Sequence, residues 1–118
     1  MKIGELAAVS GISAHTIRYY ERIGLMTAGS RDRSGHRSYD AGALVWIEFL
    51  GRLKTTGMPI REMLRYAKLR EQGPVSEPAR QALLMAHRKM VRAHVDELVA
   101  CLDVLDAKIA GYGDQSKA

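Results

Sequence analysis

The sequence has few of the features that mark a secreted or membrane-embedded protein. It has one cysteine, Cys101, so no disulfide can form within the chain, and a reducing compartment is favoured. It has no apolar run long enough to span a bilayer, and residues 1–5 lack the apolar core of a signal peptide. Its three prolines are too few for a disordered chain. We therefore expect a folded, cytoplasmic protein with no membrane partner.

The length of 118 residues accommodates one small domain of about 70 residues and one appended element. A domain of that size is near the lower limit for an independent hydrophobic core, so a long amphipathic helix beside it needs a partner. The expected division is a domain over residues 1–74, a helix over 75–112 and a mobile tail over 113–118.

The charge is divided unevenly along the chain. Residues 1–70 carry 12 Lys/Arg against 6 Asp/Glu, a net +6, whereas residues 71–118 carry 6 against 7, a net −1. This split is typical of a polyanion-binding front half, although a basic surface kept for solubility would look the same. The motifs must decide between the two.

Two short helices are predicted at the N-terminus. Ile3 and Leu6 indicate a first helix closed by Gly11, and Ser13 is suited to cap a second helix over residues 14–23. Two helices separated by so short a turn form a candidate helix-turn-helix.

The second helix has a basic and aromatic face opposite its apolar one. Three- and four-residue spacings bring four side chains to one face: His15, Arg18, Tyr19 and Arg22. In the DNA major groove Arg can donate twice to guanine, and the hydroxyls of Tyr and of Thr16 can reach phosphates. Exposed helix faces are commonly charged, but this face on the second helix of a turn-linked pair favours DNA.

Residues 27–40 are too polar to build a core and are predicted to form a hairpin, or wing. The wing residues predicted to contact DNA are Arg33, His36, Arg37 and Tyr39. Tyr39 has an alternative role in packing on the third helix. Asp40 is suited to cap that helix, which ends at residues 56–57, and Lys54 in its last turn complements the helix dipole and is predicted to reach the DNA backbone.

A fourth helix is predicted from Pro59 to a linker at residues 71–75, followed by a final helix from about Ser76 to Tyr112. In this final helix, apolar residues recur with the alternating spacing of three and four residues that defines a coiled-coil seam, interrupted only by Arg88. The predicted dimerisation residues are Leu84, Val91, Val95, Leu98, Leu102, Leu105 and Ile109. A seam with no partner in its own chain implies a second copy of the protein.

Three runs of the sequence resemble the MerR family of transcriptional regulators. They are Ile3-Gly4-Glu5-Leu6-Ala7, Thr16-Ile17-Arg18-Tyr19-Tyr20-Glu21-Arg22-Ile23-Gly24-Leu25 and Gly35-His36-Arg37-Ser38-Tyr39. The Thr-Ile-Arg-Tyr-Tyr-Glu core is highly specific, the wing supports it independently, and the match extends to about residue 112. By position, Arg18, Tyr19, Arg37 and Tyr39 match the family's DNA-contacting residues.

The resemblance implies a mainly α fold: a winged helix-turn-helix with a small β wing, followed by a long antiparallel coiled-coil dimerisation helix. It implies a homodimer on double-stranded promoter DNA, at a pseudo-palindromic operator in an over-long promoter spacer. Such a dimer bends and untwists the DNA so that RNA polymerase meets both promoter elements in register. It implies neither an enzymatic activity nor a cofactor.

The effector is less well defined. The run Trp46-Ile47-Glu48-Phe49-Leu50 is similar to the branch of the family that responds to aldehyde and nitrosothiol stress, but Arg52 stands where that branch has its reactive cysteine. The chain therefore responds either to another small-molecule effector or to none, acting by DNA occupancy alone. Cys101 is a candidate redox or electrophile sensor, with a half-buried packing role as the alternative.

Metal binding, DNA architecture and catalysis are the competing interpretations. His87, His94 and Cys101 lie seven residues apart, about 10 Å along one helix, so a metal site would need an antiparallel partner's ligands, and one thiol per chain cannot build a thiolate cage. An excisionase-like DNA-architecture protein is the alternative among DNA binders, but a long dimer helix argues against it. No nucleophile has an activating partner at fixed spacing, so we expect no catalytic and no metal site.

Overall fold

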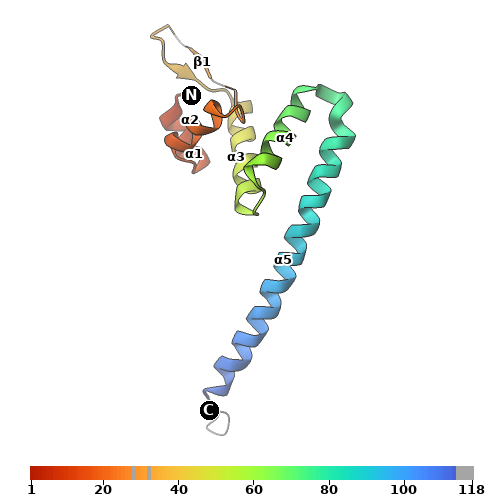
Figure 1. Ribbon diagram of the computed structural model, residues 1–118. Helices are drawn as coiled ribbons and strands as arrows, with labels where there is room; N and C mark the ends of the chain where they lie inside the picture. Colours follow the sequence, from red (N-terminus) through yellow and green to blue (C-terminus); the bar gives the residue numbers. More distant parts are fainter. Residues whose placement is uncertain (28, 32, 114–118) are drawn as a thin grey trace. The chain divides into compact units, whose positions relative to one another are not determined.

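The computed structural model describes residues 1–113 with the exception of 28 and 32, and it is mainly helical with one small hairpin (Figure 1). The elements are α1 (Ile3–Ser10), α2 (Ala14–Arg22), β1 (Ser30–Arg31), β2 (Arg37–Ser38), α3 (Ala41–Thr55), α4 (Ile60–Glu71), the 3₁₀ helix η1 (Gly73–Ser76) and α5 (Glu77–Gly111). The predicted fold class is confirmed in its helices, its two-stranded wing and its long last helix. Of the predicted tail, residues 114–118 lie outside the described residues.

A glycine ends α1 and a serine caps the start of α2, as predicted. Gly11 has φ +74°, which a side chain would disfavour, and its N–H donates to the Ala7 carbonyl at 3.0 Å. Ser13 caps α2 by accepting from the Thr16 N–H at 3.1 Å. The turn between α1 and α2 is therefore encoded locally, by one glycine and one serine.

Residues 1–80 form one compact unit, in which α1 packs against α2 and α3, and α3 against α4. The largest fully buried side chains are Leu6, Ile17, Tyr20, Leu25, Ile47, Leu50 and Met63. They come from four helices and from the loop after α2, so burial of this shared apolar core holds α2 in place.

An aromatic cluster joins that loop to α3 and α4. The indole N–H of Trp46 donates to the Leu25 carbonyl at 3.0 Å, and the Tyr66 ring stacks on the indole at a centroid distance of 6.0 Å. The Arg70 guanidinium lies 4.3 Å from the centre of the indole ring. The segment leaving α2 toward the wing is thus fixed by both a hydrogen bond and ring packing.

The segment after α4 differs from the plain linker predicted at residues 71–75. It ends in the 3₁₀ turn η1, where the buried Ser76 hydroxyl contacts the carbonyls of Leu69 and Gly73. Arg80 Nε donates to Ser76 Oγ at 2.9 Å. The serine hydroxyl thus links the last turn of α4 to η1 and gives the segment a defined turn.

Residues 81–118 form a second compact unit, in which α5 continues to Gly111. Within α5 none of the described residues is buried. In the part of the chain that the structure describes, no helix has the length and apolar character needed to cross a membrane.

Candidate nucleic-acid interface

The outward face of α2 is formed as the sequence predicted. Ile17 and Tyr20 are buried in the core, so the opposite face of the same helix points to solvent. His15, Arg18 and Arg22 are exposed there, Tyr19 is 37% exposed, and the Arg22 guanidinium lies 5.5 Å from the Tyr19 ring centre. These side chains form a basic and aromatic surface about two helical turns long.

Thr16 lies at the start of this surface and is only half-buried. Its hydroxyl accepts from Ser13 Oγ at 3.0 Å, and its N–H donates to the same oxygen. The side chain is thus part of the capped first turn, the position from which a phosphate contact was predicted.

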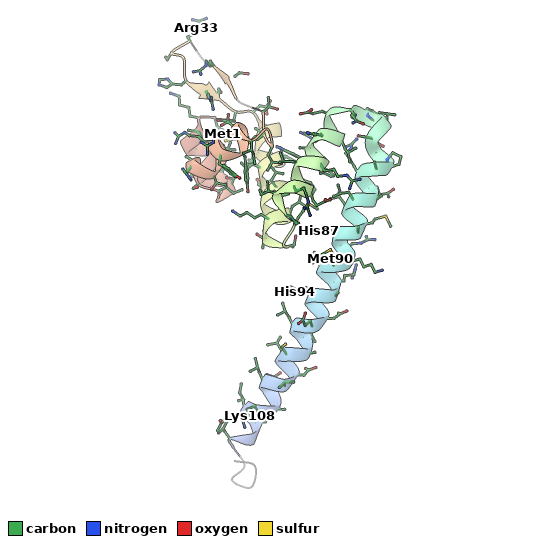
Figure 2. All side chains as sticks on the ribbon, viewed as in Figure 1. Met1, Arg33, His87, Met90, His94 and Lys108 are labelled. Carbon is green, nitrogen blue, oxygen red and sulfur yellow. The ribbon has the colours of Figure 1, made fainter. Side chains whose placement is uncertain are left out.

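The wing is a short antiparallel hairpin in which Ser30 pairs with Ser38 and Arg31 with Arg37. Arg31 Nη1 donates to the Gly35 carbonyl at 2.7 Å across the hairpin. Gly29 is required for close approach, because a Cβ there would lie 2.6 Å from the Ser38 carbonyl oxygen. The exposed residues Arg33 and His36 lie in the loop that joins the two strands. Figure 2 shows Arg33 at the far end of the wing.

The base of the wing is tied to the N-terminus. The Met1 amino group donates to the Tyr39 carbonyl at 2.7 Å, and the Tyr39 N–H donates to the Met1 carbonyl at 2.6 Å. Sequence reasoning missed this pairing, which has no local signal because the two residues are 38 positions apart.

Glu21 connects α2 to the wing, and sequence reasoning missed it too. Its side chain is 5% exposed, and its two oxygens accept separate hydrogen bonds, from Arg37 Nη1 at 2.8 Å and from the Tyr39 hydroxyl at 2.7 Å. A signal was available, since Glu21 follows Ile17 by four residues and so lies on the buried side of α2. A carboxylate on that side needs partners.

Tyr39 is 3% exposed, so it packs within the domain, which is one of the two roles that the sequence left open. Burial raises the pKa of Tyr39, the hydrogen bond and charge of Glu21 raise it further, and Arg37 partly offsets this. The hydroxyl is therefore a stable donor at neutral pH. In this conformation the ring is buried and the hydroxyl donates to Glu21, and the DNA contact of Tyr39 stays a prediction.

Arg37 is partly exposed to solvent and partly bound within the domain. Its side chain is 39% exposed while one of its nitrogens is held by Glu21, which leaves other N–H groups facing solvent. Lys54 lies exposed in the last turn of α3, separate from this ion pair.

The predicted dimerisation residues form a row along α5. Leu84 and Val91 are half-buried, whereas Val95, Leu98, Leu102, Leu105 and Ile109 are 49–67% exposed. Cys101 is exposed on the same helix. Among the described residues, no three His, Cys, Asp or Glu side chains lie close enough together to hold a metal ion.

A cleft of about 500 Å³ opens beside the wing base, and its walls include Tyr39, Asp40, Trp46 and Arg70. Asp40 Oδ1 already accepts from the Ala43 N–H, and the Arg70 guanidinium lies over the Trp46 ring. The Asp40, Trp46 and Arg70 side chains of this cleft are thus engaged with the protein itself.

The chain was compared with known proteins. Residues 2–39 match the model of the MerR family regulatory protein. An uncharacterised HTH-type transcriptional regulator of Haemophilus influenzae is 35% identical over 102 residues, 86% of this chain and 76% of the relative. The HTH-type transcriptional regulator AdhR of Bacillus subtilis is 36% identical over 89 residues, 75% of this chain and 64% of the relative.

Two solved structures extend the similarity along nearly the whole chain. A putative MerR family transcriptional regulator from Listeria monocytogenes has a TM-score of 0.90 and 37% identity, with 98% of this chain and 87% of that chain covered. HiNmlR, described as a MerR family regulator lacking the sensor domain and bound to promoter DNA, has a TM-score of 0.90 and 32% identity, covering 98% and 88%.

Proposed function

This chain belongs to the MerR family of transcriptional regulators, and we propose that it binds a pseudo-palindromic promoter operator as a homodimer and distorts that DNA to control transcription. Its proposed partners are double-stranded promoter DNA, a second copy of itself and RNA polymerase at the promoter. Readout combines base contacts from α2 with the energy of deforming the spacer DNA.

The observation that carries this proposal is the exposed face of α2 beside an arginine-rich wing in one compact unit. Arg18 and Arg22 extend from a helix whose other side is buried, and Arg37 is hydrogen-bonded to that same helix. The similarity to HiNmlR, which was solved bound to promoter DNA, covers 98% of this chain. A recognition helix in the major groove with wing arginines on phosphates accounts for both features.

The homodimer is supported by the row of apolar side chains on α5. Leu98, Leu102 and Leu105 are each more than half exposed on a helix that buries no described residue within the single chain. A second copy placed antiparallel to it would remove these leucines from water, and it would hold two recognition helices at a fixed spacing.

For the effector, we propose a small molecule that acts without a metal cage. Cys101 is the only thiol of the sequence and is exposed, so a thiol-directed effector has one place to react. Oxidants or electrophiles that change operator binding of the native chain but not of Cys101→Ser would identify it as the sensor. Identical responses of the two proteins would leave it a packing residue.

A nuclease footprint on the DNA upstream of the protein's own gene and its neighbours tests the proposal. We expect a two-fold symmetric protected site in a promoter spacer, with enhanced cleavage at its centre where the DNA is distorted. Protection without symmetry or central distortion would instead support an architectural role, and no protection on any promoter fragment would contradict the proposal.

A further inference from the structure

We infer that Glu21 is a positioning residue for DNA binding: its buried carboxylate locks the wing to the recognition helix and aims Arg37 at a phosphate. The inference rests on the proposed function, since it assigns a part within the DNA interface. It is unexpected from charge alone, because a carboxylate within a polyanion-binding surface opposes DNA electrostatically.

Both carboxylate oxygens of Glu21 are hydrogen-bonded. One oxygen accepts from Arg37 Nη1 at 2.8 Å and the other from the Tyr39 hydroxyl at 2.7 Å, so each oxygen has one partner. With only 5% of the side chain exposed, water does little to compete for these bonds. A direct base contact from this carboxylate, such as acceptance from a cytosine amino group, is ruled out by its burial in this conformation.

The two partners of Glu21 both belong to the wing, whereas Glu21 belongs to the recognition helix. Arg37 is in β2 and Tyr39 follows this strand immediately, whereas Glu21 lies near the end of α2. The hairpin itself consists of only two pairs of residues, which is too little to hold its direction without support. The two hydrogen bonds to Glu21 supply that support, together with the pairing of Met1 and Tyr39.

Arg37 is held by Glu21 and is still partly exposed to solvent. Its side chain is 39% exposed, and only one nitrogen, Nη1, donates to Glu21. The planar group is anchored by Glu21 and by the hydrogen bond of Arg37 that lowers the pKa of Tyr39, so its exposed part is held in one orientation. An anchored guanidinium loses less conformational entropy on meeting a phosphate than a free one does.

The positioning role of Glu21 and the net charge of the protein predict opposite effects of Glu21→Gln on DNA binding. Replacing Glu21 by Gln adds one positive unit of net charge per protomer, which by electrostatics alone strengthens binding to DNA. If Glu21 positions Arg37, the same substitution weakens operator binding, by roughly tenfold or more when both wings of the dimer are released.

The experiment compares full-length Glu21→Gln, Arg37→Ala and the double variant on an operator duplex that the native protein selects from a random-sequence library. Glu48→Gln is the matched control, since Glu48 is exposed on α3 and the charge change is the same. Binding is measured across salt concentrations, and phosphate protection is mapped by hydroxyl-radical footprinting. If the native protein selects no sequence, the proposed function is refuted. This outcome is known before any variant is made, so it is distinguishable from failure of the inference on Glu21.

We expect Glu21→Gln to lose the same phosphate protections as Arg37→Ala although Arg37 is still present, with recognition-helix protections retained. The salt slope of log Kd should fall by about two, one phosphate contact per protomer, and the double variant should bind no worse than Arg37→Ala. Glu48→Gln should bind as tightly as the native protein or more tightly. Glu21→Gln binding as tightly as Glu48→Gln, with every protection in place, would overturn the inference.

A second measurement needs no DNA. Hydrogen exchange of the free protein should be faster at the wing amides of Ser30, Arg31, Arg37 and Ser38 in Glu21→Gln, and unchanged in Glu48→Gln. If Glu21→Gln fails to fold, Tyr39→Phe provides the same test, because it removes one of the two bonds and keeps the buried ring. Native-like exchange in the wing of a folded Glu21→Gln or Tyr39→Phe protein would contradict the locking role.

Discussion

Arg18 and Arg37 both belong to the proposed DNA surface, but the protein prepares them differently. Arg18 is exposed on α2, a helix fixed by its cap and by the buried face opposite. Arg37 is on a short hairpin and depends on Glu21 for its direction. The backbone alone thus suffices to place the first arginine, whereas the second needs a neighbouring side chain.

We predict that Arg18→Ala abolishes specific operator binding and leaves the dimer intact. Loss of a bidentate guanine contact costs about 1–3 kcal/mol, and the loss occurs twice per dimer. Gel-shift titration against specific and non-specific DNA measures the first effect, and sedimentation measures the second. Arg61→Ala is the control, because its side chain is 86% exposed on α4 and the same charge is removed. Tight operator binding by Arg18→Ala would show that α2 is not the recognition helix.

A second residue-scale prediction concerns stability. Trp46→Phe removes the indole N–H that donates to the Leu25 carbonyl and should lower the free energy of unfolding by about 1–3 kcal/mol, because that carbonyl loses its partner. Tyr66→Phe keeps the ring that stacks on Trp46 and should change stability little. Urea denaturation of both variants checks this, and equal midpoints for the two would argue against the role of the hydrogen bond.

At the scale of elements, helix ends explain much of the domain. α2 and α3 each begin with a polar cap, Ser13 and Asp40, and both caps are visible in the sequence as polar residues ahead of an apolar repeat. The start of α5 is different, because its preceding turn is organised by Ser76 and Arg80. That arrangement needs the end of α4 to be in place first.

We predict that Asp40→Ala lowers the free energy of unfolding by about 1 kcal/mol. The Asp40 carboxylate accepts from the Ala43 N–H at 2.9 Å, and alanine leaves that N–H without its capping acceptor. Asp40→Asn keeps a capping oxygen and should retain most of the stability. Thermal denaturation followed by circular dichroism distinguishes them, and an Asp40→Ala protein as stable as Asp40→Asn would mean that the cap contributes nothing.

At the scale of the whole molecule, the proposed function requires two copies. The exposed apolar row of α5 has no use in a single chain, and the operator proposed here has two half-sites. Dimerisation and DNA binding are therefore expected to fail together when the row is disrupted.

We predict that Leu98→Asp weakens dimerisation and operator binding together, because it places a charge in the centre of the apolar seam. Val104→Asp is the control, since Val104 is 70% exposed on α5 but lies outside the seam spacing. Sedimentation equilibrium and gel-shift titration give the two readouts. A monomeric Leu98→Asp protein with full operator binding would contradict the dimer proposal.

We propose one alignment of the two copies from the charges beside the seam. In an antiparallel pair with Val95 opposite Leu105 of the partner subunit, Leu102 faces Leu98 of the partner subunit, and most of the seam overlaps. Arg92 then lies near Asp106 of the partner subunit, twice per dimer.

We predict that Arg92→Asp weakens the dimer about tenfold through two like-charge contacts, a change of about 1.4 kcal/mol. The double variant Arg92→Asp, Asp106→Arg should recover native dimerisation. Both variants can be measured by sedimentation at low and high salt, where screening should reduce the difference. If the double variant does not recover native dimerisation, this alignment is rejected. The proposal that the apolar seam joins the two copies does not depend on that result.

The sequence by itself determined the order of the helices, the caps of α2 and α3, the wing and the outward face of α2. These features are local, since a cap joins residues three apart and a helix face joins residues three or four apart. The predicted exposure of Arg18 and Arg22 followed from the buried positions of Ile17 and Tyr20 alone.

Only the tertiary structure decided how Glu21, Tyr39 and Met1 meet. Their contacts span 18 and 38 positions of the chain, and they exist because the core brings the N-terminus, the end of α2 and the base of the wing together. A tyrosine beside arginines has the same composition whether it contacts DNA or packs inside. The burial of the Tyr39 ring was decided by the tertiary structure, because burial depends on every neighbouring element and not on the local sequence.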